Sequence, residues 1–323
     1  MESKDTKRKV KEQKKSKLIN SRGKLKKLRS DYFIQKCFNY ISERKSLEII
    51  KYNKNIQKRI NIDINNYRNY SEKYSSIEIE IIPFQIDYGK FINIENKEDV
   101  NYYHIYFNNK NIEIKRNYFF ENEKVEKIKI IIDYQVDNFS RLFFNCLAIK
   151  SLNFKKFVRT NIINMTDMFY WCSPLKELDA SNLKTNNVVK MIGMFYGCSS
   201  LKKINVSNFN TSNVTDMSNM FNGCSLLQKL DLSNFNTNKV IDMSDMFNGC
   251  SSLKEINFSS FNTYNVNDMR NMFFRCLSLK KINFSNFNIA NVTDISHMFY
   301  GCNDELKRIA KEQIKNIKEQ AFG

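Results

Sequence analysis

Cysteine is the residue type whose spacing in this chain most directly suggests chemistry. Stacked thiols could form disulfides, bind a metal ion or carry out redox reactions. An odd set of equivalent positions cannot pair uniformly, and every one but the first follows a Met-Phe pair at a fixed distance. We therefore expect buried structural thiols. Seven of the eight cysteines recur every 26 residues: Cys146, Cys172, Cys198, Cys224, Cys250, Cys276 and Cys302.

Histidine, the usual acid–base catalyst, is scarce, since the chain has only His104 and His297. His104 falls in an expected strand, His297 falls in a repeat slot elsewhere held by Asn or Asp, and neither has a partner apparent from the sequence. The chain also lacks the Gly-rich phosphate loops and the metalloprotease and hydrolase motifs. We expect no enzyme activity and no cofactor.

Aspartate precedes the Met-rich segment in four successive units, at Asp216, Asp242, Asp268 and Asp294. An aspartate there can cap a helical turn by accepting a backbone N–H. A calcium ladder is the alternative, but each unit offers one carboxylate where calcium takes about six to eight oxygens. We interpret these residues as caps and expect no metal site.

The 26-residue period itself predicts stacked units that bury their apolar faces against one another. One unit begins at Asn213 as NVTDMSNMFNGCSLLQKLDLSNFNTN, and the next follows at Lys239 without an insertion. The triplet Leu201, Ile204 and Val206 has the L-x-x-L-x-L strand spacing, while Met217, Met220 and Phe221 have the i, i+3, i+4 spacing of a short helical turn. We expect an α+β fold, a right-handed leucine-rich-repeat solenoid with a parallel sheet on one face, after a small helical segment and a β-rich cap.

Strand alternation predicts a polar face on this sheet, because residues that flank an inward side chain point outward. This face mixes both signs of charge and has no aromatic residues, which favours a protein partner over nucleic acid. The partner-binding residues expected on the concave side are Glu177, Asp179, Lys203, Asn205, Lys229, Asp231, Glu255, Asn257, Lys281 and Asn283.

The stretch S-N-F-N-T-S-N-V-T-D-M-S-N-M-F-N-G-C-S at 207–225 resembles the BspA-type leucine-rich repeats. The resemblance covers residues 138–303, about half of the chain. It implies a surface or adhesion protein whose repeats bind host or cell-surface partners, here exported without a standard signal peptide.

Composition divides the chain into five expected segments. They are a basic tail at 1–30, a helical segment at 31–68, a β-rich capping segment at 69–137, about seven repeats at 138–303 and a capping helix at 304–323. Alternating apolar residues predict strands at 77–82, 103–107 and 127–132, and a hairpin joins 103–107 to 112–114. Leu306, Ile309, Ile314 and Ile317 give the last segment its helical apolar stripe.

Charge is concentrated at the N-terminus, where residues 1–30 hold thirteen Lys/Arg and three Asp/Glu within a chain of net charge +18. This tail could contact nucleic acid, an anionic membrane or an import receptor, or stay solvated. The first 31 residues lack the apolar core of a secretory signal, and no stretch reaches the roughly 18 apolar residues of a membrane helix. We expect a cytoplasmic protein, with the nucleus and the cell surface as alternatives.

The residues C-F-N-Y-I at 37–41, followed by Leu47, resemble an F-box within residues 28–60. Leu28 is followed by Arg29 where the F-box has Leu-Pro. The resemblance implies a substrate adaptor of a ubiquitin ligase, with the repeats selecting the target. The first hypothesis is nevertheless a non-enzymatic protein-binding platform.

Overall fold

A computed structural model describes residues 31–39, 43–50, 53–84, 89–120 and 122–323. It divides the chain into two compact units, Met1–Tyr74 and Ser75–Gly323. The basic tail expected at 1–30 lies outside the described residues, as do parts of the F-box-like stretch at 28–60.

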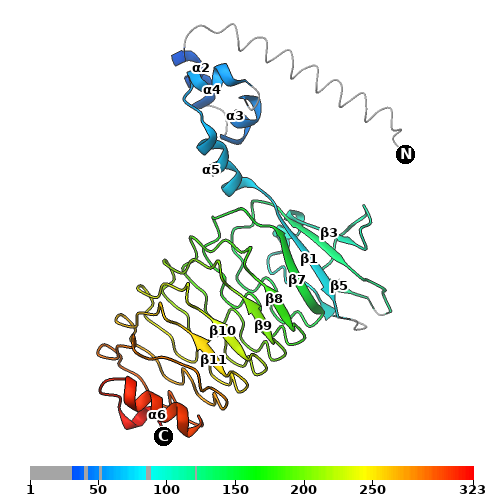
Figure 1. The fold of residues 1–323 in the computed structure, drawn as a ribbon. Helices are drawn as coiled ribbons and strands as arrows, with labels where there is room; N and C mark the ends of the chain where they lie inside the picture. The colour runs from blue at the N-terminus through cyan, green and yellow to red at the C-terminus, as the bar shows by residue number, and fades with distance from the viewer. Residues whose placement is uncertain (1–30, 40–42, 51–52, 85–88, 121) are drawn as a thin grey trace. The chain divides into compact units, whose positions relative to one another are not determined.

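The first unit contains the short helices α2 (Asp31–Asn39), α3 (Glu43–Ile50), α4 (Lys54–Arg59) and α5 (Ile64–Tyr74) (Figure 1). Asn53 begins α4, because its side-chain oxygen accepts a hydrogen bond from the Ile56 N–H at 3.2 Å. The unit has a small apolar core of its own, formed by Ile34, Phe38, Ile50, Ile56 and Ile60.

The second unit opens with an antiparallel arrangement of strands that matches the alternation in the sequence. The predicted strands are confirmed as β1 (Ile77–Pro83), β3 (Tyr103–Phe107) and β6 (Ile128–Ile132). The predicted hairpin is confirmed too, since β3 pairs with β4 (Glu113–Ile114) and places Ile105 opposite Ile114. A small two-stranded sheet joins β2 (Gly89–Lys90) to β5 (Tyr118–Phe119), and the 3-10 helix η1 (Lys97–Tyr102) leads into β3.

Strand β7 (Ile149–Lys156) joins this antiparallel part to the repeats. It pairs antiparallel with β1 and parallel with β8 (Glu177–Asp179), which in turn pairs parallel with β9 (Lys203–Asn205). The result is a mixed seven-stranded sheet in the order β4-β3-β6-β1-β7-β8-β9. Strands β10 (Lys229–Asp231) and β11 (Glu255–Asn257) form a separate parallel pair.

The expected fold class, an α+β leucine-rich-repeat right-handed solenoid with one parallel sheet, is therefore wrong. The main sheet is mixed and open, because β1 inserts between β6 and β7 with antiparallel hydrogen bonds on both sides. Strands β8 to β11 are only three residues long, and the described units 147–303 contain no helix. The second unit is mostly strands and turns, with helix confined to its ends.

The short helical turn expected around Met217, Met220 and Phe221 is also wrong. Asn219, in the middle of this segment, has a left-handed backbone with φ of 60°, and a right-handed helix cannot pass through such a residue. Asp245 and Asn271 repeat this conformation in the next two units, with φ of 57° and 54°.

This Met-rich segment instead links neighbouring units through the backbone. Alternate N–H groups donate to carbonyls of the following unit, as in the bonds from Met217 to Asp242, from Asn219 to Ser244 and from Phe221 to Met246. Isolated parallel bridges run beside them from Asn164 through to Asp294. The units are thus hydrogen-bonded to one another on two sides, one along the strands and one along this segment.

A glycine directly precedes several of the repeat cysteines and allows neighbouring units to stack closely. Gly223 has a φ of +74°, and a Cβ added there would stand 3.4 Å from the Cα of Gly197 in the preceding unit. A side chain would therefore meet both a strained backbone and a neighbouring main chain.

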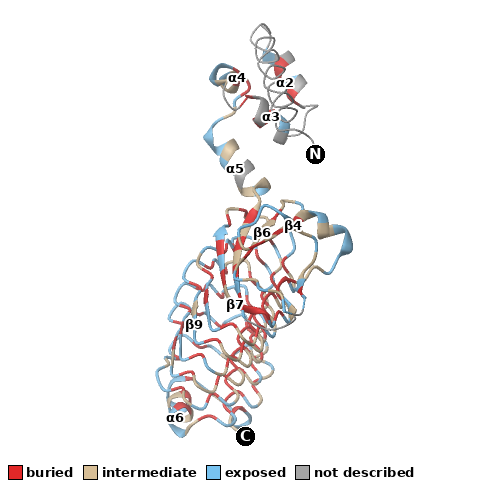
Figure 2. Ribbon diagram, turned by 90° about the vertical axis from the view of Figure 1, so that its right-hand side faces the viewer, coloured by how far each residue is buried: buried red, intermediate tan, exposed pale blue. Residues whose placement is uncertain are grey.

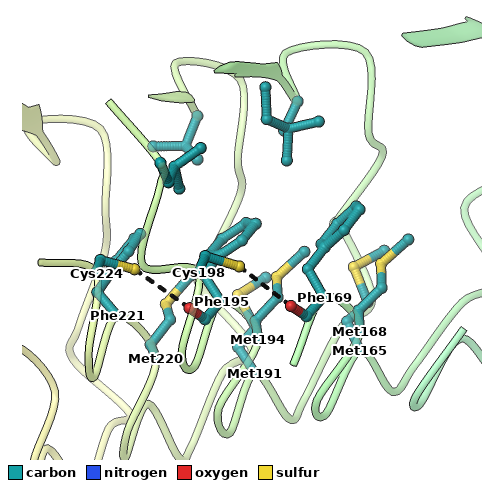
Figure 3. Packing of buried hydrophobic residues seen from close by; sticks show 14 of the residues in the cluster. Met165, Met168, Phe169, Met191, Met194, Phe195, Cys198, Met220, Phe221 and Cys224 are labelled. Atoms are coloured by element: carbon teal, nitrogen blue, oxygen red, sulfur yellow. Dashed lines mark hydrogen bonds between the residues drawn. The ribbon is translucent and has the colours of Figure 1, made fainter. Parts of the chain in front are cut away.

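The core lies between the strands and the Met-rich segments, and it consists of equivalent side chains stacked unit upon unit. Phe169, Phe195 and Phe221 are fully buried and stack with ring centroids 5.4 to 5.5 Å apart, and each unit adds two buried methionines (Figure 3). Figure 2 shows buried residues inside the array and exposed residues along its loops.

The C-terminal residues close the last unit. Helix α6 (Asp304–Gln313) follows Asn303, and Gln313 accepts a hydrogen bond from the Phe284 N–H at 2.7 Å. The 3-10 helix η2 (Glu319–Ala321) supplies backbone carbonyls to His297 and Phe299, and Phe322 stacks on Phe299 at 5.6 Å. This segment thereby takes the place that a further repeat would occupy.

Candidate functional site

The candidate site is the row of exposed side chains along β8 to β11 and the bridge that follows, which we call the strand face. Parallel pairing places Glu177 opposite Lys203 and Asp179 opposite Asn205. The residue between them points inward, as Leu178, Leu230 and Ile256 do at 3% to 4% exposure. The structure therefore brings the predicted residues into two parallel columns.

The first column, Glu177, Lys203, Lys229, Glu255 and Lys281, carries full charges into solvent. The lysine side chains are 75% to 79% exposed and pair with acids one unit away. Lys203 lies 3.6 Å from Glu177, and Glu255 lies 3.3 Å from Lys229 and 3.9 Å from Lys281. Exposed pairs of this kind contribute about 0 to 1 kcal/mol each, so the column is available to a partner at little cost.

The second column, Asp179, Asn205, Asp231, Asn257 and Asn283, has a structural task that the sequence did not reveal. Each side-chain oxygen accepts a hydrogen bond from the N–H two residues later, at 2.8 to 3.3 Å. These bonds turn the chain as it leaves the strand. Hydrogen bonds from Ser181 hold the pKa of Asp179 below its usual value, so this acid stays charged.

Sequence reasoning missed a third column beside the first. Lys150, Lys176, Lys202, Lys254 and Lys280 stand at the 26-residue spacing, and all five are exposed. The signal was present in the sequence as a lysine two residues before every inward strand residue except Leu230, which follows Gln228. Strict alternation would have pointed that residue inward, whereas the structure leaves it exposed.

The aspartates expected to cap helical turns serve a related purpose without a helix. Asp216 Oδ1 accepts hydrogen bonds from the N–H and hydroxyl of Ser218, at 2.9 and 2.7 Å, and Asp242 accepts from Ser244 N at 2.8 Å. Burial, with a smaller contribution from neighbouring Asp242 and Asp294, raises the pKa of Asp268. No cluster of His, Cys, Asp or Glu suited to a metal ion occurs among the described residues.

The repeat cysteines are buried free thiols, as the sequence predicted. The thiols of Cys198 and Cys224 donate to the carbonyl oxygens of Phe169 and Phe195 in the preceding unit, at 3.1 and 3.2 Å (Figure 3). Burial raises the pKa of the Cys198 and Cys250 thiols to about 12, which keeps them protonated and unreactive.

His104 has partners that the sequence did not suggest, so the interpretation of an isolated histidine is wrong. Its Nδ1 lies 2.9 Å from Glu113 Oε1, and its Nε2 lies 3.3 Å from Asp133 Oδ2. Hydrogen bonding to Glu113 is the main cause that raises the pKa of His104. His297 lies apart from this group, at an exposed left-handed turn of the last unit with φ of 55°.

A comparison with protein families finds one match that covers the repeats in two overlapping stretches, residues 137–230 and 224–321. The family is described as "Mycoplasma protein of unknown function, DUF285", and the match spans more than half of the chain. The chain belongs to the DUF285 family. The DUF285 repeats coincide with the stretch that resembles BspA-type surface repeats, whereas the F-box-like stretch at 28–60 lies outside the match.

The DUF285 match describes a family and no activity. A comparison with curated proteins finds no match to this chain. Across the described residues, no helix combines the length and the apolar character needed to cross a bilayer.

Proposed function

We propose that this DUF285 protein is a non-enzymatic binding platform that holds a protein partner on its strand face. The observation that carries the proposal is the first column, where charged side chains in equivalent positions of successive units stand largely in solvent. Their backbones are fixed by hydrogen bonds between units, so few backbone degrees of freedom are lost on binding. An extended polar surface of this kind suits recognition of another protein.

The test compares partners captured by two forms of the full chain from a lysate of its source cells. In the strand-face variant, Lys203, Lys229 and Lys281 are all changed to Ser. We expect it to recover the specific partner about tenfold less well, because the three most exposed charges of the face are lost. Its free energy of unfolding, measured in urea, should stay within about 1 kcal/mol of wild type, since only surface ion pairs disappear.

A matched control carries Ser at Lys110, Lys184 and Lys315, which are exposed and lie outside the strand face as defined above. It should recover the partner as wild type does. Equal recovery by the strand-face variant and wild type would place the binding site elsewhere. The identity of the partner separates the alternatives, because ligase subunits would favour the adaptor and proteins labelled on intact neighbouring cells would favour adhesion.

A further inference from the structure

Exposed lysines stand two residues before the inward strand residue in five of six successive units and form a row, interrupted at Gln228, that is here called the lysine column: Lys150, Lys176, Lys202, Lys254 and Lys280. Backbone hydrogen bonds connect their positions from unit to unit. The Lys202 N–H donates to the Lys176 carbonyl at 2.8 Å, and the Lys280 N–H donates to the Lys254 carbonyl at 3.1 Å. Lys150 and Lys176 come just before Ser151 and Glu177, which are paired in β7 and β8.

Within the described part of the chain, none of these five lysines makes an ion pair. Glu177 and Glu255, which directly follow Lys176 and Lys254 in the chain, pair with lysines of the neighbouring first column. At the far end Arg308 and, more weakly, the charge of Lys280 lower the pKa of Glu305. Like charges placed side by side on adjacent strands repel one another, so the column is unfavourable in the free protein.

The fold itself does not require lysine at this position. The equivalent residue of the fourth unit is Gln228, which is also exposed and whose carbonyl accepts the Lys254 N–H at 2.9 Å. A neutral side chain of similar length therefore keeps the same backbone pairing. The backbone pairing of the units therefore does not account for the repeated positive charge.

We propose that the partner held on the strand face contributes an extended, acidic polypeptide segment that lies along the lysine column. The proposal rests on the proposed function and specifies the chemistry of its partner. Lys203, Lys229 and Lys281 lie beside the column and add to its positive potential, and binding an acidic segment would relieve the repulsion between stacked lysines.

The dimensions suit an extended peptide. Six units with strands about 4.8 Å apart place Lys150 and Lys280 about 24 Å apart along the stack. An extended chain advances about 3.3 Å per residue, so a segment of about eight residues spans the column. Alternate side chains of such a segment would face the lysines.

The neighbouring columns favour a peptide over nucleic acid. Asp179 and Asp231 lie on the same face, and Glu177 and Glu255 alternate with the first-column lysines, so the face lacks the uniformly basic stripe of a nucleic-acid groove. The three columns contain no aromatic residue on which bases could stack. Their asparagine amides can instead hydrogen-bond to a polypeptide backbone.

Lysine footprinting on the full chain tests the proposal. It reports each lysine separately, so binding at the lysine column is distinguished from binding at residues 1–30. Each amine is acetylated with and without a probe, and the modified positions are quantified by mass spectrometry. The probes are an oligoglutamate of about ten residues, an oligoglutamine of equal length and an oligothymidylate of equal charge. We expect oligoglutamate to slow acetylation of the column lysines about fivefold or more, and the effect to fall at high salt.

Four exposed lysines off this face, Lys110, Lys184, Lys190 and Lys315, serve as internal controls and should change little with any probe. Protection confined to residues 1–30, or equal protection of control and column lysines, would overturn the inference. So would protection of the column by oligothymidylate and not by oligoglutamate, which would point to nucleic acid.

A second variant links the footprint to the natural partner. Lys176, Lys202, Lys254 and Lys280 are changed to Gln, the residue that the fourth unit already carries, and the control changes the four off-face lysines to Gln. Loss of the captured partner with the first variant alone supports the acidic segment. If the Gln variant captured the partner as wild type does while the strand-face Ser variant lost it, the proposal of an acidic segment would be refuted and the proposed platform would stand. Undiminished capture by both would overturn the platform itself.

Discussion

At the residue scale, polar side chains of the repeats mainly satisfy the backbone of their neighbours. The buried thiols donate to carbonyls of the preceding unit, and the buried hydroxyl of Thr211 donates to the Asn236 carbonyl at 2.9 Å. Asn213 and Asn265 donate from their side-chain amides to the preceding unit at 2.9 and 2.7 Å. The abundance of asparagine therefore has a physical use, because each amide satisfies a carbonyl that a turn leaves unpaired.

His104 is the residue at which pH should act on stability. Its pKa is raised in the folded protein by Glu113, so its contribution is fully present below the unfolded pKa of about 6.5 and is lost as pH rises through the folded pKa. We expect His104→Gln to lower the free energy of unfolding by on the order of 1 kcal/mol near pH 5.5, and by less near pH 8.5. Urea unfolding at the two pH values measures the difference.

The matched control is His297→Asn, because equivalent units carry Asn219 and Asn271 in the same left-handed position. It replaces a histidine without changing the group formed by His104, Glu113 and Asp133. An effect of His104→Gln that does not change with pH would show that the imidazole stays neutral between Glu113 and Asp133.

At the scale of single elements, helix α6 depends on one residue at its start. Asn303 Oδ1 accepts the Leu306 N–H at 2.9 Å, while its Nδ2 donates to the carbonyls of Leu277 and Leu279 at 3.0 and 2.9 Å. The same side chain thus begins the helix and attaches it to the last repeat. Leu306 and Ala310 then bury the inner side of α6.

We expect Asn303→Ala to destabilise the second unit by about 1 to 3 kcal/mol, because both the cap and the donors to two carbonyls are lost. Asn303→Ser retains a cap oxygen and loses the donors to the two carbonyls without placing an acceptor against them, so it should recover about 1 kcal/mol of that loss. Urea unfolding followed by circular dichroism compares the three proteins. Equal stability of the Ala variant and wild type would mean that α6 docks through its apolar face alone.

At the scale of the whole second unit, stability comes from contacts between neighbouring units. No repeat buries its own Phe, Met and Cys side chains without the next one, and the two backbone ladders also run between units. Damage to one interface should therefore weaken the array more than the loss of a single contact.

Leu230→Asp tests this coupling, since Leu230 is 3% exposed and pairs with Ile256 in the next strand. Placing a carboxylate there should cost several kcal/mol, about the penalty for burying an unpaired polar or charged group. We expect a lower melting temperature and a broadened transition by circular dichroism. Gln228→Asp introduces the same residue at an exposed position two residues away and should melt like wild type, whereas normal melting of Leu230→Asp would refute the stacked core.

The sequence by itself determined the period of the repeats, their inward residues and the first strands of the second unit. The 26-residue recurrence of Cys, Met and Phe permits only stacked units, and alternation as in I-E-I-E-I-I at 77–82 separates buried from exposed residues locally. These features depend on side chains a few residues apart. A reader of the sequence can therefore recover them without knowing any distant contact.

Tertiary structure alone decided the fold class and the environment of the candidate site. A left-handed residue such as Asn219 breaks the helix that the Met-Phe spacing favours, because hydrogen bonds to the next unit outweigh local propensity. Strand β1 makes the main sheet mixed by pairing with β7, about 70 residues further along the chain. The partners of His104 likewise arise from contacts between strands, which no local pattern encodes.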